Sequence, residues 1–283
     1  MVDHRDFFGC RYPIVCVSMN QVSDGKLAIA VEKAGAMPSL FYESSALLRK
    51  ELEIFNGSNI IVTVCCDDLL DAMPILLEYR TTHVELCGSY KNLEPSLIIS
   101  LVKYLKNRNV KILFKQPAPN EYLLPYLDAV VLKGNEGAGT ILRHSETIDS
   151  IIPQYKNTPV VATGGVSSYE RMNKLLILGA MSVGIGTLFA VSKESKVSDT
   201  TKLKMIQNES MMFNRKINNW KRYIQIGNLE QNDDYNMTNN LSSAVNGNDG
   251  IVYAGKGIES VNSILTVEQI VKKLMAPAQG IEP

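Results

Sequence analysis

Short apolar runs alternate with amphipathic stretches from residue 13 to residue 195. The stretches between the runs predict helices: Leu97, Leu101 and Leu105 lie four residues apart, and Ser167 with Glu170 has the spacing of a capping box. The runs are rich in β-branched residues and predict buried strands at 13–19, 37–41, 59–65, 83–87, 110–114, 129–133, 158–163 and 181–185. Eight alternating strands predict a (β/α)8 (TIM) barrel. An open doubly wound sheet stays possible, because periodicity does not show whether a sheet closes.

The last two predicted strands both end in a glycine turn. One turn is Gly164-Gly165 and the other is Gly186-Thr187. Parallel strands place both turns at the same edge of the sheet, where glycines allow close backbone approach and helix N-termini favour an anion. Barrels of this type often bind phosphate after strands seven and eight, so we predict a phosphate site here. The alternative is that these glycines only make tight turns.

After residue 195 the pattern changes. Residues 202–217 predict one long surface helix, with Trp220 and Tyr223 near its end, and residues 266–275 predict a final helix with Thr266 as its N-cap. Residues 229–250 are polar and Asn-rich, which is typical of a loop or lid. We therefore expect two units: a barrel over 1–195, and over 196–283 a C-terminal helical extension whose polar, lid-like segment packs on the barrel.

The composition is that of an ordinary globular protein. The chain has 283 residues, 45% hydrophobic and 20% charged, and its 29 basic and 29 acidic residues give a net charge of zero. Since no basic block and no long apolar run occurs, neither nucleic acid nor a membrane is expected as a partner. No apolar signal core begins the chain, and the five cysteines form no CxxC pair. We expect a cytoplasmic protein with reduced thiols and no metal site.

Residues at the carboxyl ends of barrel strands are the candidates for chemistry, because active sites of (β/α)8 barrels lie there. A glycine-rich loop with a carboxylate, 133–140, follows the sixth strand. The other candidates at strand ends are Ser18, Met19, Asn20, Gln21, Thr63, Glu85, Cys87, Lys115 and Gln116.

Several motifs together resemble one family, the nitronate monooxygenases, formerly called 2-nitropropane dioxygenases. Their relatives include the flavin-dependent enoyl-acyl-carrier-protein reductase II. The matching stretches are PIVCVSMNQVSDGKLAIAVEKAGAM at 13–37, GNEGAGT at 134–140, PVVATGG at 159–165, GTLFAVSKES at 186–195 and YAGKGIESVNSILTVEQIV at 253–271. The resemblance covers most of the chain apart from 229–250.

The resemblance implies an FMN-binding TIM barrel. The FMN phosphate is then expected on Gly164, Gly165, Gly186 and Thr187. The flavin ring is expected to face Ser18, Met19, Asn20, Thr63 and Lys133, with Lys115 within reach. A lysine beside the ring stabilises negative charge on the reduced flavin. Lys115 as a solvated strand-end lysine is the alternative.

One position departs from the family pattern. The family has a histidine after its paired glycines, and Thr140 stands here instead. A threonine hydroxyl can donate a hydrogen bond to a nitro or carbonyl oxygen, but it has no usable pKa for proton abstraction. Thr140, His144 and Lys115 are therefore the candidate catalytic residues. Glu85 is a possible buried base, although pairing with a core lysine is the simpler prediction.

These observations favour an FMN-dependent oxidoreductase that resembles nitronate monooxygenase. Three alternatives stay open: an NAD(P)H-dependent enoyl-thioester reductase, a flavin-binding scaffold or partner subunit without turnover, and a flavin-free barrel that binds a phosphorylated metabolite. A small-molecule or acyl substrate is expected, and a homodimer is plausible. No GxGxxG motif follows any predicted strand.

Overall fold

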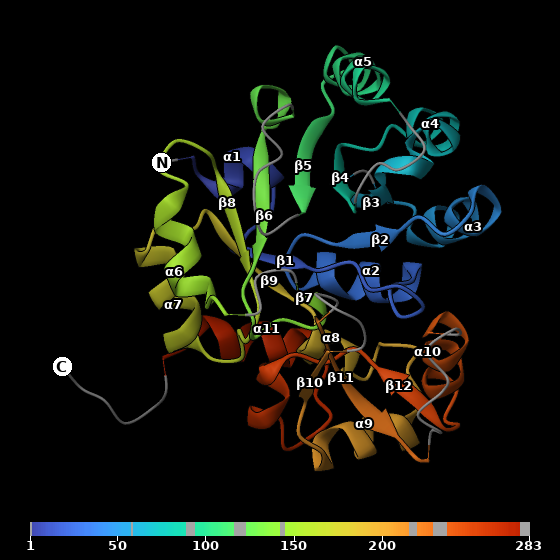
Figure 1. The fold of residues 1–283 in the computed structure, drawn as a ribbon, viewed down its shortest axis with the longest axis vertical. Coiled ribbons are helices and arrows are strands. Elements are labelled where there is room, and N and C mark those ends of the chain that lie inside the picture. Colours follow the sequence, from blue (N-terminus) through green and yellow to red (C-terminus); the bar gives the residue numbers. More distant parts are fainter. Residues whose placement is uncertain are drawn as a thin grey trace.

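Eight parallel strands form a nearly closed barrel in the computed structural model, which describes residues 2–57, 59–88, 94–115, 123–141, 145–214, 220–228 and 237–277 (Figure 1). The strands are β1 (Ile14–Cys16), β2 (Ser39–Phe41), β3 (Ile61–Cys65), β4 (His83–Cys87), β5 (Lys111–Lys115), β6 (Ala129–Lys133), β8 (Val160–Thr163) and β9 (Ser182–Ile185). Their order is β1-β9-β8-β6-β5-β4-β3-β2. A parallel bridge between Val15 and Met37 joins the two edges of the sheet. The predicted (β/α)8 barrel is confirmed, and the open sheet is excluded.

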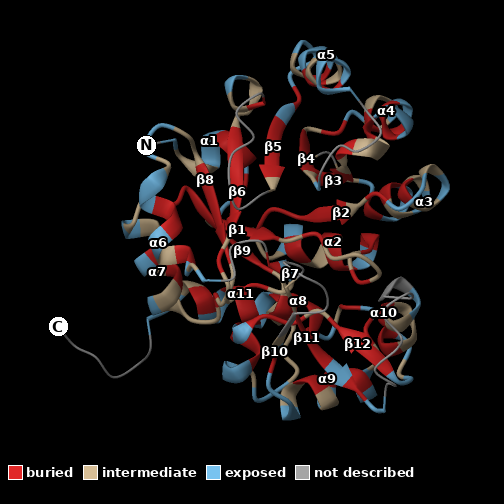
Figure 2. Cartoon of the chain, viewed as in Figure 1, coloured by how far each residue is buried: buried red, intermediate tan, exposed pale blue. Residues whose placement is uncertain are grey.

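Helices surround this barrel. They are α2 (Gly25–Lys33), α3 (Ser45–Phe55), α4 (Leu69–Glu78), α5 (Pro95–Lys106), α6 (Ile148–Ile151), α7 (Tyr169–Ile177), α8 (Thr187–Ala190) and, from the C-terminal part, α11 (Val267–Met275). Their apolar faces pack on the outward-facing residues of the strands, so the strands are buried on both faces (Figure 2). The N-cap of α7 is Ser168, whose side chain accepts from the Arg171 amide, so the predicted capping box at Ser167 is wrong by one residue. Thr266 is the N-cap of α11, as predicted, and the structure adds a capping box with Gln269.

The short helix α1 (His4–Phe8) closes the amino-terminal end of the barrel. Phe7 and Phe8 pack with the inward-facing apolar residues of the barrel, and the backbone carbonyl of Phe7 lies 2.9 Å from His83 Nε2. Burial lowers the pKa of His83 to about 4, so this histidine is a neutral core residue. His4 lies at the start of α1.

The segment between α8 and α11 contains α9 (Asp199–Gln207), β10 (Met211–Asn214), β11 (Trp220–Ile226), α10 (Met237–Val245) and β12 (Gly250–Val252). The strands pair antiparallel in the order β10-β11-β12, and β7 (Gly139–Ile141) from the loop after β6 also pairs with β11. The predicted helix over 202–217 is wrong, because α9 ends at Gln207 and Trp220 and Tyr223 lie in β11. The extension is therefore mixed α/β instead of helical.

The predicted lid over 229–250 is only partly described. Residues 229–236 lie outside the described residues, and the remainder contains α10 and the start of β12 instead of an unpatterned loop. Apolar residues of α10, β11 and β12 form one buried cluster with Val22, Ala190 and Val191. The extension therefore packs against the loop after β1 and against α8, below the barrel in Figure 1. The boundary at residue 195 stays a prediction.

Short 3-10 helices complete the described elements. They are η1 (Cys66–Asp68), η2 (Leu124–Tyr126), η3 (Ile152–Gln154) and η5 (Lys256–Ser260). Of these, η2 lies between β5 and β6. No helix among the described residues is both long enough and apolar enough to cross a membrane.

Candidate active site at the carboxyl end of the barrel

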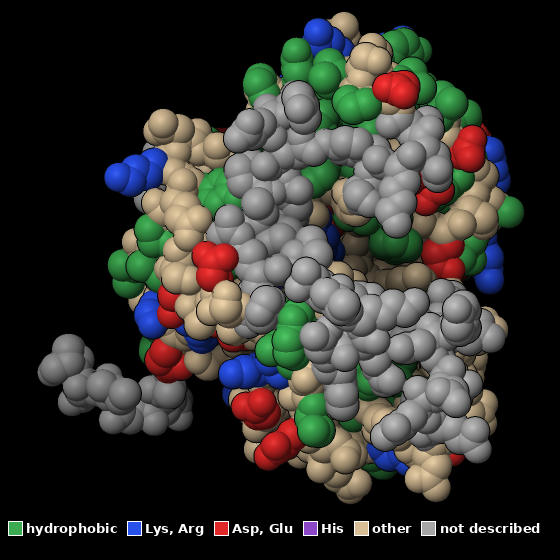
Figure 3. Space-filling model, viewed as in Figure 1, with side chains coloured by type: hydrophobic (Ala, Val, Ile, Leu, Met, Phe, Trp, Pro, Cys, Tyr) green, Lys and Arg blue, Asp and Glu red, His purple; other side chains and the backbone are tan. Residues whose placement is uncertain are grey.

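A cavity opens at the carboxyl end of the barrel, between the strand ends and the extension, and the space-filling surface is hollowed there (Figure 3). It contains about 950 Å³ of space free of protein atoms, counted out to the solvent at its mouth. Its lining comes from the segments after β1, β6, β8 and β9, from the end of β5, and from α10, β12 and the loop that follows β12. This is the end at which (β/α)8 barrels place their active sites.

The cavity gathers the residues predicted to hold a cofactor, apart from Thr63. Its lining includes Ser18, Met19, Asn20, Lys115, Lys133, Gly164, Gly165, Gly186 and Thr187. Thr63 lies directly behind the lining, where its hydroxyl accepts a hydrogen bond of 2.5 Å from Ser18. The strand ends therefore bring these residues to one place, and their roles as cofactor ligands stay predictions.

On one side of the cavity, glycines leave space where side chains would stand. Gly164 and Gly165 have φ values of +111° and +66°, a backbone conformation that favours glycine. A Cβ on Gly184 would lie 2.4 Å from Thr163 Cγ2, whereas a Cβ on Gly186 would have no neighbour nearer than 3.8 Å. The backbone of β8 and β9 is thus directly accessible from the cavity. We call the residues 164, 165, 184, 186 and 187 the glycine wall.

The loop that follows β6 folds over the glycine wall. A Cβ on Gly164 would lie 3.0 Å from the Gly137 amide nitrogen, and one on Gly165 would lie 3.0 Å from Glu136 Cβ. The Glu136 carboxylate accepts from the Ile148 amide (3.2 Å) and from Arg171 (3.3 Å). The backbone carbonyl of Glu136 also accepts a hydrogen bond from the Lys256 amide, at 2.9 Å. The carboxylate of the GNEGAGT motif therefore fixes the loop and is not free to take a proton from a substrate.

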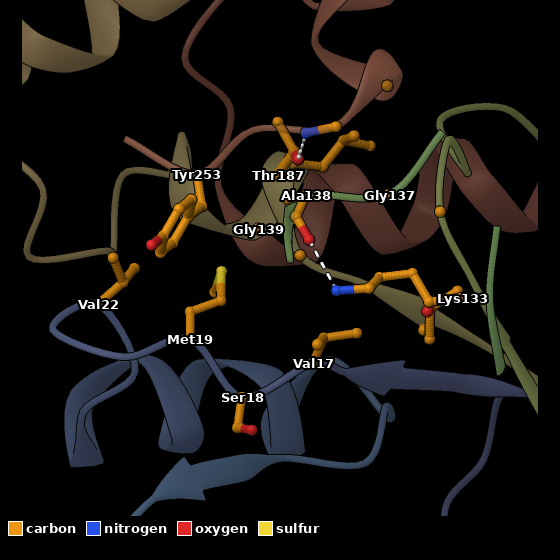
Figure 4. A pocket seen from close by; sticks show the side chains of 18 of the residues that line it. Val17, Ser18, Met19, Val22, Lys133, Gly137, Ala138, Gly139, Thr187 and Tyr253 are labelled. Carbon is orange, nitrogen blue, oxygen red and sulfur yellow. Dashed lines mark hydrogen bonds between the residues drawn. The ribbon is translucent and has the colours of Figure 1, made fainter. Parts of the chain in front are cut away.

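Opposite the glycine wall, polar side chains form a connected chain inside the barrel. Ser18 donates to Thr63, Thr63 donates to Glu85 Oε1 (3.0 Å), and Lys115 Nζ lies 3.2 Å from the same oxygen. Figure 4 shows the Ser18 side chain turned away from Met19 and the cavity. Glu85 is only 4% exposed. Its partner is Lys115, which confirms the simpler prediction that Glu85 pairs with a lysine.

Lys133 is the second cation at the cavity. Its Nζ donates to the Ala138 carbonyl at 2.9 Å (Figure 4). Burial, together with the nearby charge of Lys115, lowers the pKa of Lys133 to about 7. This amine can therefore gain or lose a proton near neutral pH, as an acid or base in catalysis must.

The orphaned side-chain oxygen of Asn20 points to a ligand. Asn20 Oδ1 is buried at the cavity and has no hydrogen-bond partner among the described residues. A buried amide of this kind normally finds a partner. A ligand with a polar edge, such as a flavin ring, would supply one.

The extension adds an apolar wall that the candidate residues at the strand ends did not include. Leu241 of α10, Val252 of β12 and Tyr253 line the cavity together with Met19 and Val22 from the loop after β1. Figure 4 shows the Tyr253 ring facing Val22 and Met19. The only signal in the sequence was the YAGKG stretch, since Gly255 and Gly257 also line the cavity. A Cβ on Gly255 would lie 2.6 Å from the Glu136 carbonyl oxygen, so the glycine allows this contact.

The candidate catalytic residue Thr140 does not reach the cavity. Thr140 is exposed in β7, where it pairs with Lys221 of β11, and it is absent from the cavity lining. His144 lies outside the described residues. Among the described residues, no group of three or more His, Cys, Asp or Glu side chains could hold a metal ion.

A (β/α)8 barrel with a ligand cavity at its carboxyl end is the arrangement of a barrel enzyme. A sequence model described as nitronate monooxygenase matches residues 122–277, more than half of the chain. The chain belongs to the nitronate monooxygenase family, which consists of flavin-dependent oxidoreductases.

Individual proteins of similar sequence are also described as probable nitronate monooxygenases. The chain is 26% identical to a probable nitronate monooxygenase of Bacillus subtilis, in a match that covers 74% of this chain and 67% of that protein. It is 27% identical to one of Staphylococcus aureus over 52% of this chain and 48% of that protein, so the match spans about half of that relative.

Two solved structures share the fold. A variant of FabK from Thermotoga maritima has a TM-score of 0.82 at 20% identity, covering 96% of this chain and 93% of its own. Nitroalkane oxidase from Streptomyces ansochromogenes has a TM-score of 0.76 at 19% identity, covering 95% and 96%.

Proposed function

We propose that this protein is an FMN-dependent oxidoreductase whose site is the cavity at the carboxyl end of the barrel. The observation that carries the proposal is the pairing of the glycine wall with two lysines, Lys115 and Lys133, around one cavity. An anion needs close backbone approach, and a reduced flavin needs positive charge near its ring. Family membership supports the flavin, and the proposal adds that the flavin is FMN.

In this proposal each wall has one task. The glycine wall holds the FMN phosphate, with the Gly164, Gly165 and Gly186 backbone close to it. The Thr187 hydroxyl already accepts from the Gly255 amide at 2.9 Å, so its own proton is available to donate to the phosphate. The Asn20 amide bonds the polar edge of the ring. A bound flavin supplies the two-electron chemistry of the reaction.

The lysines set the charge at the ring. Lys115 is held by Glu85, so its position is fixed and part of its charge is offset. Lys133, held by the Ala138 carbonyl, delivers or receives a proton near neutral pH. The predicted catalytic role of Lys115 is retained as charge stabilisation. Thr140 has no role in this proposal, because its side chain is exposed and does not line the cavity.

We propose a substrate with an apolar part, because Val22, Leu241 and Tyr253 form one wall of the cavity. Alkyl nitronates and short acyl thioesters both satisfy this condition. Oxidation of an alkyl nitronate passes electrons to oxygen, whereas reduction of an enoyl thioester uses NAD(P)H. We place the protein in the cytoplasm and retain a homodimer as a prediction.

The experiment is a steady-state assay on FMN-loaded protein. Oxygen consumption with an alkyl nitronate is compared with NAD(P)H oxidation with an enoyl thioester. Lys133→Met should lower kcat by about 100-fold if Lys133 moves the proton. Thr140→Val serves as the control and should leave kcat within about twofold. FMN-loaded protein without either activity would contradict the enzymatic proposal and favour a flavin-binding scaffold.

A further inference from the structure

Two cysteines lie side by side inside the barrel, close to the cavity. Cys65 ends β3 and Cys87 ends β4, and the two residues are directly opposite each other in the strand register. Both lie two residues beyond the hydrogen-bonded pair Thr63 and Glu85, so they face the interior as well. Their sulfur atoms are 3.8 Å apart.

This geometry is compatible with a disulfide. Neighbouring strands lie ~4.8 Å apart, and disulfides occur with Cα atoms ~4.4–6.8 Å apart. The sulfurs must approach from 3.8 Å to a bonded distance of ~2.05 Å, which side-chain rotation and a small strand shift can supply. Both side chains are partly exposed, so an oxidant has access.

The pair also differs chemically from the other thiols. The hydrogen bond with Cys87 lowers the pKa of Cys65, and the same hydrogen bond together with burial raises the pKa of Cys87. Asp67 and Asp68 oppose the ionisation of Cys65, and Lys115 favours that of Cys87. Burial raises the pKa of Cys10 to about 11 and of Cys16 and Cys66 to about 12, so these three thiols stay protonated.

We infer that Cys65 and Cys87 form a redox-sensitive thiol pair that hydrogen peroxide converts to a disulfide beside the active site. The Cys65 thiolate attacks one peroxide oxygen, the O–O bond breaks, and a sulfenic acid and hydroxide form; the hydroxide takes up a proton. The Cys87 sulfur then attacks the Cys65 sulfur, the S–S bond forms, and the oxygen leaves as water with the Cys87 proton. Two thiols lose two electrons, and one peroxide becomes two waters.

The disulfide would form next to the cavity. Cys87 is in register with Lys115, whose side chain lines the cavity.

The test is thiol mapping of the folded protein. Reduced protein is exposed to increasing hydrogen peroxide, quenched in denaturant with an alkylating agent, and analysed by intact mass and non-reducing peptide mass spectrometry. The Cys66→Ser variant is the matched control, because Cys66 is adjacent in sequence but belongs to the outer apolar cluster. Its removal also makes the peptide assignment unique.

We expect a Cys65–Cys87 cross-link in the natural chain and in Cys66→Ser, formed at least about tenfold faster than oxidation of the buried thiols. Cys65→Ser and Cys87→Ser should lose the cross-link, and Cys87→Ser should stop at a sulfenic acid on Cys65. Cys65 and Cys87 that stay fully alkylated, or oxidise singly without a cross-link, would overturn the inference. A cross-link between other cysteines would overturn it as well. The readout is independent of any cofactor.

Discussion

The two sides of the barrel mouth build the same cavity by opposite means. The glycine wall at the ends of β8 and β9 has almost no side chains, and a larger residue at 164, 165 or 184 would strain the backbone or overlap a neighbour. On the charged side, β4, β5 and β6 carry long ionisable side chains: Glu85 and Lys115 hold each other as an ion pair, and Lys133 is held by the Ala138 carbonyl. Substitutions in the glycine wall should therefore destabilise the protein by steric overlap, whereas substitutions on the charged side should do so by leaving a charge without its partner.

The largest expected effect is on the charged side. Glu85→Gln removes the negative partner of Lys115 while it keeps the size of the side chain. Breaking a buried ion pair leaves an uncompensated charge, so we expect the free energy of unfolding to fall by about 3 kcal/mol in urea denaturation. Glu78→Gln, which breaks an exposed pair with Arg49, should have a much smaller effect. Equal effects of the two variants would contradict the account.

On the glycine wall, Gly184→Ala should come next. The new methyl group would overlap Thr163 Cγ2 at 2.4 Å and Val17 Cγ2 at 2.8 Å, and φ of this glycine is not in the left-handed region. Overpacking of this kind should lower the free energy of unfolding by about 2 kcal/mol. Gly186→Ala is the matched control: its methyl group would make only ordinary van der Waals contacts, with Met19 Sδ at 3.8 Å and Val17 Cβ at 3.9 Å, so it should leave stability unchanged and weaken FMN binding. If Gly186→Ala were less stable than Gly184→Ala, the steric account of the glycine wall would be contradicted.

The pH dependence of stability sharpens the comparison, because only the charged side titrates near neutral pH. The folded pKa of Lys133, about 7, lies below the ordinary lysine value of 10.5. Between these values the unfolded chain holds a proton that the folded protein lacks, so stability rises with pH. The slope is at most about 1.4 kcal/mol per pH unit. Lys133→Met should flatten this dependence in cofactor-free protein, and parallel curves for the two proteins would contradict the shifted pKa.

Thr187 should give the smallest effect. Thr187→Val removes the hydroxyl that accepts from the Gly255 amide and leaves that buried N–H without a partner. We expect a loss of about 1 kcal/mol in urea unfolding, and Thr187→Ser should restore it. If serine does not rescue the variant, the hydrogen bond is not what connects the start of α8 to the loop after β12.

Local patterns predicted most of the barrel and little of the extension. A strand followed by a glycine turn and a capped helix is visible within about thirty residues, as for β8 and α7. The strand β11, by contrast, pairs with β7 and β12, with Trp220 opposite Ile141 and Ile224 opposite Val252. Such distant pairing leaves no periodic signal along the chain, so the pattern over 202–217 predicts a helix that the structure does not have.

In the candidate site too, residues on the barrel strands were predictable and residues on the extension were not. Lys115 and Lys133 were predictable because they end strands, and the (β/α)8 rule brings strand ends together. Tyr253 and Leu241 were missed because they reach the cavity from the extension. Thr140 was predicted from its place in a motif, whereas the local strand β7 turned it to the outside.

The central claim is that the glycine wall and the lysines hold FMN, and one measurement tests it most directly. The purified protein is examined by visible absorbance, and its cofactor is released by heat and identified by mass spectrometry. The account predicts flavin absorbance and FMN in the released fraction, at close to one per chain after reconstitution. A colourless protein that does not take up added FMN would contradict it, and would leave a barrel that binds some other phosphorylated ligand.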